Sequence, residues 1–161
     1  MPSPKEGVLK ALLGGWETSG IWNWQSGFPL SITSNDDRSL SAVGLDLADE
    51  IGPRSYTSGS RATRIAQWFN TSSFTSAQLG TFGNAGRNIL IGPKTFNIDF
   101  SAHKVFTIRE RWRLQYRAEF FNVLNHTQLN NPDTGVIDSN FGRITGARSP
   151  RILQMALKMI F

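Results

Sequence analysis

The chain has 161 residues, of which 18% are charged and 39% are hydrophobic. This length allows one domain at most and excludes a large multidomain enzyme, and the apolar content excludes a disordered chain. No stretch approaches about 18 uninterrupted apolar residues, which excludes a transmembrane helix. A membrane-spanning β-strand is not excluded, because its alternating pattern escapes a hydropathy window.

The net charge of +5 and the isoelectric point of about 10.1 allow an anionic partner such as nucleic acid, lipopolysaccharide or an acidic ligand. The absence of cysteine excludes disulfides, thiolate catalysis and cysteine-ligated zinc. The N-terminal run MPSPKEGVLK lacks the apolar region of a signal peptide. We therefore expect either a cytoplasmic protein or the tail of a longer one.

The first predicted strand covers residues 15–33. Alternate positions place one set of mostly aromatic side chains on one face, namely Trp16, Thr18, Gly20, Trp22 and Trp24. The run FPLSITS continues the alternation, so we expect the strand to extend to Thr33 across a kink or bulge at Gly27.

A long loop rich in Ser, Gly, Asn and Asp is predicted over residues 34–94. A loop of about sixty residues is unusual inside a compact soluble domain, where loops longer than about 15 residues are uncommon. The segment SRATRIAQWFN has Ile65, Trp68 and Phe69 at helical spacing and predicts a short helix packed into the loop's own small core. The segments FGN and FGR, at Phe82 and Phe141, are interpreted as loop turns.

Two strands over residues 95–108 and 111–122 are predicted to form a β-hairpin across the polar turn at 109–111. One face of the hairpin is apolar and is interrupted only by Lys104. Its apolar members are Phe96, Ile98, Phe100, Ala102, Phe106, Ile108, Trp112, Leu114, Tyr116, Ala118 and Phe120. The charged residues of the opposite face are Asp99, His103, Arg113, Arg117 and Glu119.

A second long loop, over 123–149, precedes a last strand over 150–161. Long loops at one end of the strands and a tight turn at the other are typical of outer-membrane barrels. Apolar faces of roughly 9–11 residues also suit a tilted membrane crossing. We therefore predict an all-β fold with about four antiparallel strands of a transmembrane β-barrel, long extracellular loops and one short loop helix. A soluble sandwich is the alternative, because its strands also have one apolar face.

Five segments covering most of Gly14–Phe161 carry a resemblance to a known family. They read GGWETSGIWNWQSGFPLSITS, RIAQWFNTSSF, GTFGNAGRNILIGPKTFNIDFSAHKVF, RLQYRAEFFNVLNHTQ and NFGRITGARSPRILQMALKMIF. Through them the chain resembles the C-terminal part of a TonB-dependent outer-membrane receptor. It is most similar to the Oar-like branch with a carboxypeptidase-regulatory-like domain, common in acidobacteria.

The resemblance implies a role for the chain, residues 1–161, as a C-terminal fragment of a receptor that imports a ligand. The apolar positions before the terminal Phe resemble the signal that the barrel-assembly machinery reads, and here they are Leu153, Met155, Leu157, Met159 and Phe161. Four strands cannot close a barrel, so the remaining barrel, the plug and the energy-coupling segment are expected upstream. The implied location is the Gram-negative outer membrane with the C-terminus in the periplasm. The implied partners are lipid, lipopolysaccharide, the assembly machinery and the inner-membrane energy-coupling complex.

The charged face is interpreted as a lumen wall. On it Asp99, Arg113, Arg117 and Glu119 form a cross-strand charge ladder and not a catalytic pair, and His103 is a polar residue of the same wall. His103 and His126 lie far apart in sequence and are weak evidence for a metal site. The common enzyme motifs for nucleophile elbows, phosphate loops and zinc proteases are absent. We therefore expect no enzyme activity and no cofactor.

Two clusters in the first long loop admit a functional interpretation beside a plain one. The acidic residues Asp36, Asp37, Asp46, Asp49 and Glu50 lack calcium-loop spacing and are interpreted as a solvated loop. The basic residues Arg54, Arg61, Arg64 and Arg87 suit lipopolysaccharide phosphates or an anionic substrate, or serve solubility alone.

Alternatives to the receptor fragment are an adhesion or envelope role in the Oar-like branch and a soluble basic β-domain that binds nucleic acid or polysaccharide. The soluble domain would need an aromatic groove, for which only Trp22 and Trp24 are candidates. We expect no nucleic-acid partner.

Overall fold

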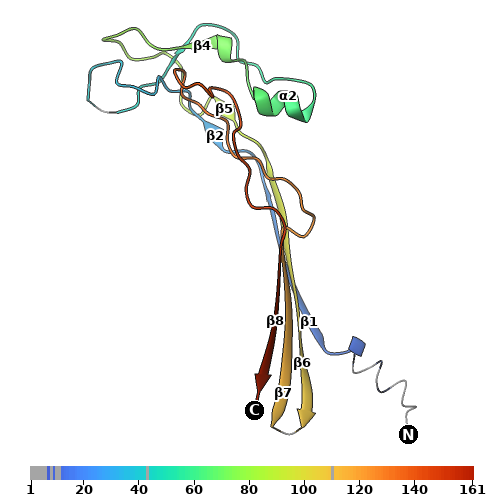
Figure 1. The fold of residues 1–161 in the computed structure, drawn as a ribbon. Coiled ribbons are helices and arrows are strands. Elements are labelled where there is room, and N and C mark those ends of the chain that lie inside the picture. The colour runs from blue at the N-terminus through green and yellow to red at the C-terminus, as the bar shows by residue number, and fades with distance from the viewer. Residues whose placement is uncertain (1–6, 8, 10–11, 43, 110) are drawn as a thin grey trace. The chain divides into compact units, whose positions relative to one another are not determined.

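A computed structural model describes residues 7, 9, 12–42, 44–109 and 111–161. The chain divides into two compact units, each drawn in Figure 1. Unit 1 contains the long strands and comprises Met1–Trp24, Phe96–Thr127 and Ser149–Phe161. Unit 2 comprises Gln25–Thr95 and Gln128–Arg148. Its two segments are inserted between strands of unit 1.

Unit 1 is built on a four-stranded sheet whose strands, in spatial order, are β1, β6, β7 and β8. They span β1 (Trp16–Gln25), β6 (Thr95–Arg109), β7 (Trp112–Phe121) and β8 (Ile152–Ile160). The strands β6, β7 and β8 pair antiparallel, with Ala118 opposite both Ala102 and Met155. The prediction of about four antiparallel strands is confirmed. The sheet does not close on itself, because β1 and β8 are its two edges within the described residues.

The predicted hairpin between β6 and β7 is present, and alternation explains why both segments are strands. The register shifts between Thr107 and Arg109, which marks a bulge beside the turn. The turn is shorter than expected, because Arg109 belongs to β6 and β7 begins at Trp112. Glu110, in the middle of the predicted turn, lies outside the described residues.

Unit 2 contains the hydrophobic core. Two short antiparallel pairs support it, one between β2 (Pro29–Leu30) and β5 (Leu90–Ile91) and one between β3 (Asp49–Glu50) and β4 (Phe74–Thr75). The helix α2 (Arg61–Ala66) and the 3-10 turn η1 (Thr71–Ser73) complete it. The buried core side chains are Leu30, Ile32, Ala48, Phe69, Phe74 and Leu90.

The two predicted long loops are joined in one folded unit. Thr33 forms a parallel bridge with Gly135, and its backbone N–H donates to the carbonyl of Thr134 at 3.0 Å. The N–H of Trp68 donates to the carbonyl of Gly142 at 2.7 Å. Because these bonds cross from one insertion to the other, the long loops are a compact domain with its own core.

The extension of the first strand to Thr33 was wrong. β1 ends at Gln25, and Pro29–Leu30 belongs to a separate sheet in unit 2. The break falls at the predicted kink: a Cβ on Gly27 would lie 1.8 Å from the carbonyl oxygen of Gly92. Gly27 thus allows a close backbone contact with Gly92 inside unit 2, so the chain after Gln25 joins unit 2 and does not extend β1.

The predicted helix is present but shorter than its pattern. Ser60 is its N-cap and accepts from the N–H of Thr63, and the helix ends at Ala66. Phe69, fully buried, and Trp68, packed on the core, come after the end of the helix, with Trp68 in a bend and Phe69 in a β-bridge with Tyr56. The burial of Phe69 in the loop's own core and the packing of Trp68 against that core are confirmed, whereas their predicted place on a helix face is wrong.

Candidate functional site

The sheet of unit 1 has two chemically different faces. The first, which we call the apolar face, carries the even-numbered residues of β6 and β7 and the odd-numbered residues of β8. The even-numbered residues of β1 share this face, because Trp16 contacts Tyr116 while Glu17 and Ser19 contact His103 and Ser101 on the other side. Cross-strand rows on it include Phe106, Leu114 and Met159. Many of its large side chains are exposed, with Trp22 at 81% and Trp24 at 83%, while those in the middle strands such as Phe106 and Leu114 are half-buried.

The sheet has no hydrophobic core of its own among the described residues. All members of the core cluster lie in unit 2, and β8 has eight exposed positions followed by one of intermediate exposure. A large contiguous apolar surface of this kind marks a protein or membrane contact and not a surface for water.

Aromatic pairs lie on the apolar face toward the hairpin end of the sheet. Trp112 packs on Phe161 with ring centroids 5.8 Å apart, and Trp16 meets Tyr116 edge-on at 6.0 Å. The indole N–H of Trp16 donates to the carbonyl of Leu12 at 2.9 Å. Amphipathic rings in such a position suit a membrane–water interface.

Lys104, which interrupts the apolar pattern, is buried to 4% exposure. Its ammonium donates to the carbonyl oxygens of Leu12 and Gly14, at 3.1 and 2.5 Å. It also lies over the rings of Trp16 and Phe106, at 5.6 and 4.8 Å from their centroids. Cation–π contact and carbonyl acceptors together compensate the charge, so the lysine does not break the apolar face.

The opposite face, which we call the polar face, carries the five charged residues predicted for it. His103 lies opposite Arg117 in the register, and its Nε2 is 3.2 Å from a carboxylate oxygen of Glu17 on β1. Arg117 in turn lies 3.7 Å from Glu119 on its own strand. Glu17, His103 and Arg117 thus form a row across three strands, which differs from the predicted ladder because Glu17 of β1 takes part in it.

The remaining two members of the predicted set lie toward opposite ends of the face. Arg113 pairs with Thr107 and Ile160. Asp99 lines a shallow hollow of about 190 Å³ together with Ser19, Ser101 and Glu119. The structure therefore brings Asp99 and Glu119 to one hollow and leaves Arg113 apart from it.

Asp99 also has a structural role that the sequence did not reveal. Its carboxylate accepts the backbone N–H of Asn122 at 2.8 Å, just after β7 in the FFNVLNH segment. Asn122 exchanges two hydrogen bonds with the backbone of His126, both at 3.0 Å. Asn122 and Asn125 have positive φ, a conformation that asparagine tolerates. The repeated Asn after a strand was the available signal for this turn.

The five predicted assembly-signal residues all lie on the apolar face or at its end. Four of them alternate along β8 and stand opposite Phe120, Ala118, Tyr116 and Leu114 of β7. Phe161 follows the strand and contacts Trp112.

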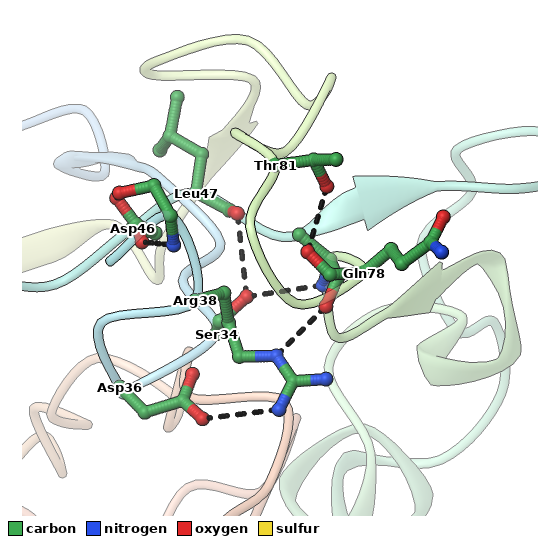
Figure 2. A network of polar contacts seen from close by, with 9 residues as sticks. Ser34, Asp36, Arg38, Asp46, Leu47, Gln78 and Thr81 are labelled. Carbon is green, nitrogen blue, oxygen red and sulfur yellow. Dashed lines mark hydrogen bonds and ion pairs between the residues drawn. The ribbon is translucent and has the colours of Figure 1, made fainter. Parts of the chain in front are cut away.

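Acidic residues of the first insertion accept hydrogen bonds from neighbouring residues of unit 2. Asp46 is buried and accepts the N–H and hydroxyl of Ser39, while Asp37 accepts the N–H groups of Ser41 and Ala42. Figure 2 shows the neighbouring network, in which Arg38 donates to the Ala77 carbonyl and pairs with Asp36. No group of three or more His, Asp or Glu side chains that could hold a metal exists in the described part of the chain.

Glu50 and Arg54 form an ion pair in unit 2. The guanidinium donates to both carboxylate oxygens, at 2.6 and 2.9 Å. This hydrogen bonding lowers the pKa of Glu50 below its usual 4.5 and raises the pKa of Arg54. The pair therefore stabilises unit 2 above the unfolded pKa of Glu50, and its contribution is lost as pH falls through the lower folded pKa.

Replacement of Glu50 by Gln is expected to remove this part of the acid sensitivity. The protection of unit 2 amides against hydrogen exchange should fall less between about pH 5 and about pH 3 in Glu50→Gln than in the parent. Arg54→Gln should reduce the acid sensitivity of exchange by the same amount, and the double variant should reduce it no further than either single variant. An acid response unchanged in both variants would show that the pair is irrelevant to stability.

The predicted basic residues lie in different environments. Arg64 stacks over Trp68 with its guanidinium carbon 5.9 Å from the ring centroid, while Arg54 is paired as above. Arg61 lies in the first turn of α2, and Arg87 is exposed. The structure does not bring these four arginines together in one site.

Comparison with known families identifies the class of protein that contains this sheet. The sequence profile of the family described as "Outer membrane beta barrel domain" matches residues 2–154, nearly the whole chain. The chain belongs to this family. No curated protein and no solved structure is significantly similar to this outer membrane beta barrel domain. No helix in the described ranges is long and apolar enough to cross a membrane.

Family membership confirms the coarse predictions. The chain is a mostly β, antiparallel outer-membrane β-barrel domain, and such domains typically are not enzymes. The apolar face is thus the part of this outer membrane beta barrel domain suited to lipid.

Proposed function

We propose that the chain forms the C-terminal barrel wall and extracellular loops of a TonB-dependent outer-membrane receptor that imports a ligand. The observation that carries the proposal is the exposed apolar face on a sheet without a core. In the family of outer-membrane barrels such a face meets lipid, and the alternating polar face lines the interior.

The proposal places unit 2 outside the cell and the hairpin turn in the periplasm. Both insertions leave the sheet at the end opposite the β6–β7 turn, as the antiparallel order requires. Long connections outside and tight turns in the periplasm are usual in these barrels. The C-terminus, after β8, is then periplasmic.

The open edges β1 and β8 require partners in a bilayer, because unpaired backbone groups cost several kcal/mol each in lipid. We propose that upstream strands of the same receptor pair with them and that a plug fills the lumen. Further proposed partners are lipid and lipopolysaccharide around the wall, the barrel-assembly machinery, and the inner-membrane energy-coupling complex. No nucleic acid is involved.

The 161 residues contain no cysteine, so a cysteine introduced into the wall is the one labelling site within this part of the receptor. In the protein expressed from its own gene, Leu157→Cys should carry a label that lipid-phase quenchers reach. Lys158→Cys, on the other face of the same strand, should be reached by water-soluble quenchers. Equal quenching at both sites would contradict the lipid-facing assignment.

Orientation has a separate test with a membrane-impermeant maleimide on intact cells. Ser58→Cys, exposed in unit 2, should be labelled, whereas Arg111→Cys at the hairpin turn should react only after the outer membrane is opened. The reverse pattern would overturn the proposed orientation.

Deletion of Phe161 is expected to lower the amount of receptor in the outer membrane severalfold. The proposed reason is that the terminal Phe, 87% exposed, ends the alternating apolar signal that the assembly machinery reads. Membrane fractions would be compared by immunoblot with Lys158→Gln, which changes the polar face of the same strand. Equal insertion of the truncated protein would exclude a role for Phe161 in assembly.

Energy coupling distinguishes an importer from an adhesion or envelope protein. Formaldehyde crosslinking in cells should join the receptor to the inner-membrane coupling protein. Absence of this crosslink from correctly inserted receptor would favour the adhesion or envelope role of the Oar-like branch.

A further inference from the structure

An open hollow of about 180 Å³ lies on unit 2 and is not used by the barrel wall. Its lining residues are Leu45, Asp46, Leu47, Phe82, Gly83 and Arg87. An apolar cavity of about 150 Å³ can hold one benzene molecule, so this hollow has room for one aromatic ring with a small substituent.

The FGN segment builds the floor of the hollow. A Cβ on Gly83 would lie 2.0 Å from the carbonyl oxygen of Leu47 and 2.4 Å from that of Ala48. The N–H of Ala85 donates to the Ala48 carbonyl at 3.0 Å. Gly83 therefore lets the segment lie directly on the backbone of residues 47–48, which holds the floor in place.

The phenylalanine rings of the two FG segments lie in different environments. Phe141, in FGR, packs against the buried Phe69 with centroids 5.4 Å apart. Phe82, in FGN, is 71% exposed at the hollow, and Leu45 beside it is also exposed. The hollow thus offers an unburied ring and an aliphatic side chain to an apolar ligand.

Two ionisable side chains line the hollow, Asp46 and Arg87, and they differ in exposure. The carboxylate of Asp46 is buried and already accepts two hydrogen bonds from Ser39, at 2.6 and 3.1 Å. Arg87 is exposed, and within the described residues its side chain makes no ion pair. The guanidinium is therefore the open charge, and its fork suits a carboxylate.

We propose that this hollow binds a small aromatic carboxylate, with the ring against Phe82 and Leu45 and the carboxylate on Arg87. The proposal deepens the function proposed above, on which it rests for placing unit 2 outside the membrane. It names the class of ligand that this outer surface would recognise.

Phenylacetate is the probe, titrated by calorimetry into the receptor purified from outer membranes in detergent, with a detergent blank. We expect saturable binding that weakens roughly tenfold in Arg87→Gln, the size expected for one charge-assisted contact. A loss of similar size is expected in Phe82→Ala, which removes the ring contact. Arg148→Gln, an exposed arginine of unit 2 outside the hollow, is the matched control and should bind as the parent does. Acetate, inorganic phosphate and 2-phenylethanol should bind at least tenfold more weakly, since each lacks one half of the recognised group.

Three results would overturn the proposal. They are unchanged binding in Arg87→Gln, phosphate or acetate binding as tightly as phenylacetate, and no saturable binding while unit 2 amides stay protected from exchange. Hydrogen exchange on each variant separates lost binding from lost folding. Because binding is measured in detergent, it can fail while the labelling tests succeed, and the reverse also holds.

Discussion

Met155→Arg is expected to destabilise the inserted barrel by about 2–4 kcal/mol, the cost of a cation on the lipid face near the bilayer midplane. Met155 lies near the middle of β8 on the apolar face and is 64% exposed. Its cross-strand neighbour is Ala118, so the longer side chain meets no steric obstacle in the sheet. The effect would therefore report the surrounding lipid and not overpacking.

Urea unfolding of the receptor in lipid vesicles measures this change. Gln154→Arg is the matched control, because it places the same charge one residue away on the polar face, opposite Glu119. It should change stability by less than about 1 kcal/mol. Equal losses in the two variants would contradict the assignment of the faces.

Phe69→Ala is expected to destabilise unit 2 by about 3–5 kcal/mol, the usual cost of removing a buried phenylalanine. Phe69 is fully buried and meets Phe74 and Phe141 edge-on, with centroids 6.0 and 5.4 Å away. The residue before it, Trp68, donates its backbone N–H to the carbonyl of Gly142 in the second insertion. The cavity would thus open the core where the two insertions meet.

Hydrogen exchange of unit 2 peptides, read by mass spectrometry, measures the free energy of opening. Phe82→Ala is the matched control, since the same atoms are removed from an exposed ring. Its effect on exchange should be within about 0.5 kcal/mol of the parent. Comparable exchange in the two variants would show that unit 2 has no cooperative core.

The strands and faces could be predicted because alternation is a local property. Each residue in β6, β7 and β8 takes its face from its position in the strand, so the pattern is readable without any partner. The alternation therefore predicted which charged residues share the polar face and which apolar residues, ending at Phe161, share the other face. The family profile over residues 2–154 agrees with this local pattern.

Long-range contacts decided the rest. The end of β1 depends on the approach of Gly27 to Gly92, and the joining of the two insertions depends on Thr33 meeting Gly135. Neither contact produces a periodic pattern of residues in the sequence. In the sequence, Lys104 interrupts the apolar face without any visible compensation. The tertiary structure supplies it, because two carbonyl oxygens and two aromatic rings surround the ammonium group. The sequence by itself thus determined which segments are strands and which side chains share a face, since these depend on backbone alternation. Only the tertiary structure decided where strands stop and how loops pack, because those outcomes depend on partners far away in the chain.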